Sequence, residues 1–170
     1  MSATAEFVKG NEPYAANFGD KKSLTLPPKK KIAIVTCMDS RLDPAAHLGF
    51  KEGDAAIIRN AGGLVSEALR SLIISQRLLG AREVAVFHHT DCGMLHFHTP
   101  QLRKIVKDAA RGDEDIAARI DAIDFHEFSD VEGSIKTDVD WLKEHPLIPK
   151  DINVTGWVYE VETGKVRQVV

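Results

Sequence analysis

The chain has 170 residues, 44% hydrophobic and 28% charged, a composition typical of one globular domain with its own core. Its formal net charge of −3 gives no reason to expect nucleic acid or an anionic membrane as a partner, and no apolar run approaches the roughly 20 residues that span a bilayer. Residues 1–20 lack the apolar segment of a secretory signal, and two cysteines do not form a disulfide scaffold, so we expect a cytoplasmic protein.

The chain divides into an expected N-terminal arm over residues 1–30 and a single domain over 31–170. Apolar runs predict four strands, at 31–38, 54–61, 82–90 and from 152 onward. Helical spacing and end signals predict a short helix that starts at Pro44 and longer helices over 66–80, over 99–112 with a continuation through 113–123, and over 129–146. The turn residues at 162–164 predict a closing hairpin at the edge of the sheet.

This alternation of strands and helices predicts an α/β fold with a mostly parallel central sheet flanked by helices. Right-handed crossovers allow the strand order 2-1-3-4, in which the chain reverses its direction across the sheet between the first and third strands. A crevice forms at the carboxyl ends of the strands at such a point. The residues that follow these two strands are therefore expected to meet, although some 50 residues separate them.

The residues at these two strand ends have the chemistry of a zinc site. Cys37, His89 and Cys92 offer two thiolates and an imidazole, and three protein ligands leave a fourth position open, as in catalytic zinc sites. The preceding residue, His88, points to the opposite side of a strand, so a packing role is expected for it. An extended segment would place Asp39 and Arg41 on the same side as Cys37, with the guanidinium holding the carboxylate.

The segments "CMDSR", "GDAAIIRNAGG" and "HTDCGM" resemble, in this order and spacing, the β-class carbonic anhydrases. The resemblance covers about residues 31–95. It implies one Zn²⁺ per subunit on Cys37, His89 and Cys92, with Asp39 and Arg41 as the catalytic dyad and Asp39 as a fourth ligand in a closed form.

The same resemblance implies a reaction and an assembly. A zinc-bound hydroxide would attack a small linear heterocumulene and convert CO₂ to bicarbonate. Gly62 and Gly63 would lie against the substrate pocket, and the chains would form a homodimer or homotetramer.

The sequence leaves several alternatives open. The chain is short, and no equivalent of the glutamine and aromatic residues that line the pocket in longer members is evident, so the substrate could be carbonyl sulfide, hydrolysed to H₂S and CO₂ as in some short members. A non-catalytic zinc protein and a redox protein that joins Cys37 to Cys92 are further alternatives. Arg59 could be structural or could brace the site. His96 and His98 are expected to be polar surface residues rather than a second metal site or a proton relay.

Overall fold

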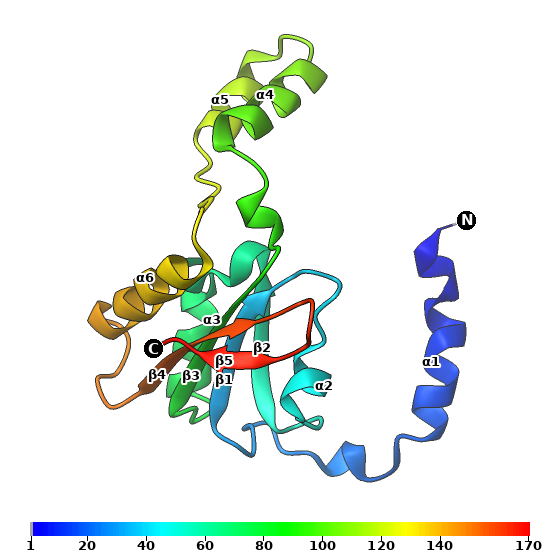
Figure 1. Ribbon diagram of the computed structural model, residues 1–170. Coiled ribbons are helices and arrows are strands. Elements are labelled where there is room, and N and C mark those ends of the chain that lie inside the picture. Colours follow the sequence, from blue (N-terminus) through cyan, green and yellow to red (C-terminus); the bar gives the residue numbers. More distant parts are fainter. Residues whose placement is uncertain (1) are drawn as a thin grey trace.

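The computed structural model describes residues 2–170 and has a five-stranded sheet at its centre (Figure 1). The sheet order is β2-β1-β3-β4-β5; β1 to β4 are parallel, and β5 runs antiparallel to β4. The strands are β1 (Ile32–Cys37), β2 (Ala55–Asn60), β3 (Glu83–His89), β4 (Asn153–Tyr159) and β5 (Val166–Gln168). This confirms the predicted α/β fold, the order 2-1-3-4 and the C-terminal edge strand.

One face of the sheet is covered by α3 (Val65–Arg77) and α6 (Val131–Glu144). Alternate residues of the strands point to this side, because successive side chains of a strand face opposite ways. The resulting core includes fully buried residues from strands and helices alike: Val35, Val86, Val158, Leu72, Ile135 and Leu142. This core packs on β1 and β3, which pair with each other over Ile32–Thr36 and Glu83–Phe87.

The opposite face of the sheet carries the short helix α2 (Pro44–Leu48). Ile34 and Phe87 face this side, and Phe87 stacks on Trp157 with ring centroids 5.8 Å apart. A groove of about 590 Å³ crosses the face, with apolar side chains from β1, β3, β4 and α2 on its walls. This face is therefore apolar but open.

The N-terminal arm contains more regular structure than expected. Helix α1 (Phe7–Ala16) lies between short 3₁₀ turns at Ala3–Glu6 and Gly19–Ser23. Figure 1 shows α1 standing apart from the sheet, and none of its residues is buried. Its contact with the body includes a hydrogen bond from the Tyr14 hydroxyl to Glu52 Oε1, at 2.6 Å.

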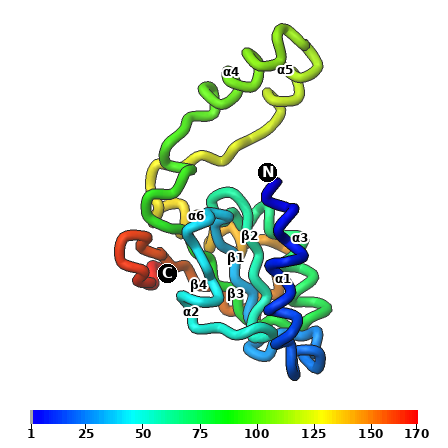
Figure 2. The backbone as a smooth tube through the Cα atoms, turned by 90° about the vertical axis from the view of Figure 1, so that its right-hand side faces the viewer, coloured from blue at the N-terminus to red at the C-terminus, as the bar shows by residue number. Residues whose placement is uncertain are grey.

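A pair of helices, α4 (Thr99–Ala109) and α5 (Glu114–Asp121), projects from the body as a second arm (Figures 1 and 2). Residues 113–123 are largely helical, as predicted, but they form a separate helix rather than a direct continuation of the first one. Arg111 and Gly112 have φ angles of +50° and +91°, which end a right-handed helix. Asp113 then starts α5 by accepting hydrogen bonds from the backbone N–H groups of Asp115 and Ile116.

Across residues 2–170, no helix has both the length and the apolar character needed to cross a membrane.

Candidate active site

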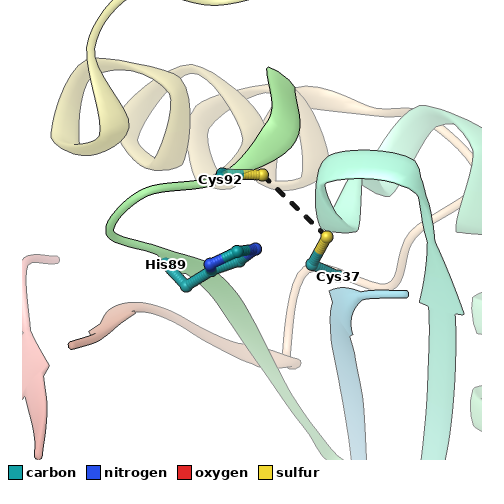
Figure 3. A group of neighbouring side chains, drawn as sticks. All are labelled: Cys37, His89 and Cys92. Carbon is teal, nitrogen blue, oxygen red and sulfur yellow. Dashed lines mark hydrogen bonds between the residues drawn. The ribbon is translucent and has the colours of Figure 1, made fainter. Parts of the chain in front are cut away.

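Three potential metal ligands meet where β1 and β3 end side by side (Figure 3). Cys37 is the last residue of β1, His89 is the last of β3, and Cys92 follows in the next loop. Their ligand atoms all lie within 4.8 Å of one another, and the two Sγ atoms are 3.9 Å apart. All three residues are buried. The topology therefore brings together side chains separated by 55 positions.

The histidine is oriented to act as a ligand through Nε2. Its Nδ1–H donates to the backbone carbonyl of Thr90 at 2.8 Å, which leaves the lone pair of Nε2 free. Nε2 is buried and has no hydrogen-bond partner. A buried polar atom without a partner is costly, and a metal ion would satisfy it.

The two thiols lie in hydrogen-bond contact with each other. A hydrogen bond from Cys92 lowers the pKa of Cys37 to about 4, whereas the same pairing and burial raise the pKa of Cys92. The pairing therefore favours the thiolate at Cys37, and the thiolate is the form that binds metals. Two sulfur atoms and one imidazole nitrogen suit zinc.

Asp39 and Arg41 lie beside this cluster, but a turn rather than an extended segment brings them there. β1 ends at Cys37, and the Leu42 N–H donates to the Asp39 carbonyl at 3.1 Å. Arg41 Nε and Nη2 donate to Asp39 Oδ1 and Oδ2 at 3.1 and 2.8 Å. These bonds hold the pKa of Asp39 at about 2. Asp39 Oδ2 is 3.8 Å from His89 Nε2, so an ionised carboxylate faces the ligand cluster.

The neighbouring strand β2 supports the turn through Arg59. Its Nε donates to the Cys37 carbonyl at 3.0 Å, and its Nη2 donates to the Asp39 carbonyl at 2.6 Å. Asn60, the next residue, holds the loop after β2 in place. Its side-chain amide donates to the Leu64 carbonyl at 2.8 Å and accepts from the Leu64 N–H at 2.7 Å. Of the two readings of Arg59, these contacts favour bracing of the site.

The two glycines of this loop have different environments. Gly62 has a φ angle of +80° and lies in the pocket wall, against Met94 and Phe128. Gly63 does not line the pocket; it packs on the backbone of Thr36, Cys37 and Phe87.

The pocket in front of the cluster has a volume of about 310 Å³. Cys37, Asp39 and Cys92 form its floor, and its walls are mostly apolar: Met38, Ala61, Met94, Phe97, Leu102 and Phe125. Phe97 and Phe125 meet edge to face, with centroids 6.4 Å apart. The sequence did not indicate Phe97 and Phe125 as wall residues, because they come from the base of the second arm.

The remaining histidines lie outside the cluster. His88 is buried on the face of the sheet that α6 covers, where its ring nitrogens contact Ser134 and Asp138 of that helix, as expected for a packing residue. His96 and His98 are exposed, with His96 Nε2 2.8 Å from Asp91 Oδ1. Asp91 itself contacts Arg41, a contact that the sequence analysis missed although Asp91 is adjacent to Cys92.

The comparisons with known proteins agree with this architecture. The sequence profile of the family described as carbonic anhydrase matches residues 32–166. Beta-carbonic anhydrase 1 of Mycobacterium tuberculosis is 41% identical, over 99% of both chains. The solved carbonic anhydrase of Glaciozyma antarctica is 55% identical, with a TM-score of 0.90 over 95% of both chains.

A second enzyme type occurs among the relatives. Carbon disulfide hydrolase of Saccharolobus solfataricus is 33% identical, over 96% of this chain and 87% of that one. The expected resemblance is thus confirmed along nearly the whole chain, and not only over residues 31–95. The chain belongs to the β-carbonic anhydrase family and is an enzyme of this type.

Proposed function

We propose that this protein is a zinc-dependent carbonic anhydrase that hydrates CO₂ to bicarbonate, with the metal held by Cys37, His89 and Cys92. The observation that carries the proposal is the buried cluster of two sulfurs and an unpartnered imidazole nitrogen. Three such ligands suit a zinc ion with one position left for a reactant. Zinc bound there would supply a nucleophilic water at neutral pH by lowering the pKa of that water.

Besides the metal ligands, Asp39 and Arg41 are the side chains of this protein that act in the proposed reaction. Asp39 is a carboxylate at neutral pH, and Arg41 lowers its pKa further, so Asp39 accepts a hydrogen bond from the attacking water and orients it. Arg41 keeps Asp39 from becoming a fourth metal ligand by occupying both of its oxygens. The apolar walls of the pocket admit a small uncharged substrate and exclude bulk water around it.

The test is kcat/KM for CO₂ hydration on zinc-loaded protein, with Asp39→Ala and Cys37→Ser beside the wild type. Asp39→Ala should retain zinc and lose activity by about 100-fold or more, whereas Cys37→Ser should lose zinc. Loss of zinc from Asp39→Ala would instead indicate a structural zinc site. Normal activity in the Cys37→Ser variant without zinc would contradict the proposal.

Carbonyl sulfide is the second candidate substrate. The apolar pocket of about 310 Å³ and the relationship to carbon disulfide hydrolases favour a sulfur-containing heterocumulene, which water would convert to H₂S and CO₂. The measurement is H₂S release from carbonyl sulfide and from carbon disulfide on the same preparation. A higher kcat/KM for either compound than for CO₂ would make the enzyme a sulfide-releasing hydrolase.

We further propose that two or more copies of the chain associate, as a homodimer or homotetramer. A ten-residue helix without buried residues, such as α1, is marginal in water on its own. Phe7 and Val8 on this helix are 67% and 79% exposed, and the groove beside Trp157 leaves a second apolar surface open. A second copy offers both surfaces and would cover both, since a symmetric interface uses the same patches twice.

Sedimentation equilibrium of a Phe7→Asp, Val8→Asp double variant tests this association. Asn11→Asp, an exposed polar change on the same helix, is the matched control. The double variant should have a lower mass than the wild type and the control at equal concentration. An unchanged mass would contradict a role for α1 in assembly.

The 3.9 Å separation of the Cys37 and Cys92 sulfur atoms also indicates the kind of cellular compartment in which the protein would bind metal. An oxidising compartment would favour a disulfide in place of metal binding, so we propose a reducing compartment such as the cytoplasm.

A further inference from the structure

Arg41 is shared between two carboxylates, and the proposed dyad uses only one of them. Its Nε and Nη2 hold Asp39, while its Nη1 donates to Asp91 Oδ2 at 2.7 Å. Nη2 also donates to the Asp91 backbone carbonyl, at 2.9 Å. Asp91 therefore offers two acceptors to the edge of the guanidinium that faces away from Asp39.

The backbone of Asp91 has the conformation that makes this double contact. Its φ angle is +50°, in the left-handed region that residues other than glycine rarely adopt, although aspartate and asparagine tolerate it best. Asp91 also lies between two of the proposed ligands, His89 and Cys92. An unfavourable conformation maintained beside an active site is grounds for a functional hypothesis.

The second oxygen of the Asp91 carboxylate is also engaged. His96 Nε2 lies 2.8 Å from Asp91 Oδ1, and because a carboxylate only accepts, the imidazole N–H donates. The side chain of Asp91 is half exposed, at 51%, so without these partners it would turn freely in solvent. Arg41 and His96 together give it a single orientation.

We propose that Asp91 is a positioning residue for the reaction: it holds Arg41 from behind, so that Arg41 presents Asp39 to the Cys37, His89 and Cys92 cluster in one orientation. Arg41 is 47% exposed, and a long side chain at such a position samples several rotamers unless both ends of its guanidinium are held. An Asp39 carboxylate released by Arg41 would compete as a metal ligand, because carboxylates also bind zinc. The proposal rests on the function proposed above for Asp39.

Two substitutions separate the contribution of the side chain from that of the backbone. Asp91→Gly removes the carboxylate but suits the positive φ angle and keeps the carbonyl that faces Arg41 Nη2. Asp91→Asn also tolerates this conformation and keeps one acceptor without the charge. Asp115→Asn is the matched control, because Asp115 pairs with Arg119 in the exposed part of α5, outside the pocket.

Three quantities are to be measured for each protein: kcat and KM for CO₂, zinc content, and the hydrogen-exchange rate of the Arg41 Nε–H by NMR. The exchange rate is measured in both zinc-loaded and metal-free protein, so it does not depend on activity. For Asp91→Gly we expect one zinc per chain, faster exchange at Arg41, and a fall of about 10–100-fold in kcat/KM, mainly in kcat. Asp91→Asn should lie between Asp91→Gly and the control.

The proposal is overturned if Asp91→Gly retains kcat/KM within about twofold of the control or leaves Arg41 exchange unchanged. Loss of zinc in parallel with activity would also overturn it, because Asp91 would then shape the ligand loop rather than Arg41. If the wild-type enzyme acts on neither CO₂ nor carbonyl sulfide, the proposed function fails. The exchange rates then decide separately whether Asp91 holds Arg41.

Discussion

Gly63 provides a quantitative test of how closely the loop after β2 packs on the strands that carry the ligands. A Cβ atom added at this position would lie 2.8 Å from the Phe87 carbonyl oxygen and 3.0 and 3.1 Å from Thr36 C and Cys37 N. All three are backbone atoms of central strands, so no side chain can move aside. The φ angle of +79° adds a second penalty for any residue with a Cβ.

Gly80 separates these two penalties. It has a similar φ angle of +73°, but an added Cβ would meet nothing within 4 Å. Gly80→Ala should therefore lose about 1–2 kcal/mol of unfolding free energy, the cost of the left-handed conformation alone. Gly63→Ala should lose about 2–5 kcal/mol, because overpacking adds about 1–3 kcal/mol.

Urea denaturation at equal protein concentration measures both free energies of unfolding. Since the clash includes the backbone nitrogen of Cys37, Gly63→Ala should also bind zinc more weakly, whereas Gly80→Ala should not. Losses that agree within about 0.5 kcal/mol, the usual error of such comparisons, would refute the argument that close backbone packing requires glycine at position 63.

Three further predictions concern the site. Arg59→Lys keeps the charge but loses the guanidinium that donates to both the Cys37 and Asp39 carbonyls. We therefore expect kcat/KM to fall about tenfold with zinc retained. An unchanged kcat/KM would argue against a role of Arg59 in holding the turn at Asp39. Zinc at about 1,000 times its Kd would stabilise the native state by about 4 kcal/mol. Removal of zinc by a chelator should therefore lower Tm by roughly 8–16 °C. An unchanged Tm would argue against the buried cluster as the metal site. Phe125→Ala should widen the pocket and raise the ratio of kcat/KM for carbonyl sulfide to that for CO₂ by roughly tenfold at constant zinc content; equal losses for both substrates would argue against a wall role.

The sequence indicated the fold and the ligand cluster because both depend on the central strands. Strands buried on both sides read as continuous apolar runs, which made β1 and β3 evident. Residues at the carboxyl ends of two neighbouring parallel strands lie at the same edge of the sheet, so the sequence alone predicts that Cys37 and His89 are close together.

The loop contacts were harder to predict, for physical reasons. A guanidinium has five N–H donors and can bind two partners, so the pairing of Arg41 with Asp39 does not exclude the second pairing with Asp91. The positive φ angle of Asp91 has no certain signal in the sequence. The break between α4 and α5 did have one, because Gly112 followed by Asp113 combines a helix stop with an N-cap.

The division of the site between core and arm has a consequence for substrate choice. The proposed ligands come from the ends of β1 and β3 and the loop that follows, whose positions depend on the packing of the sheet. The apolar wall comes in part from Phe97, Leu102 and Phe125, which lie just before α4, within α4 and after α5. Substitutions at the base of an arm outside the core can alter the pocket without moving the ligands. A shared metal site with a variable wall would allow enzymes that act on CO₂ and on sulfur-containing heterocumulenes to arise on one fold.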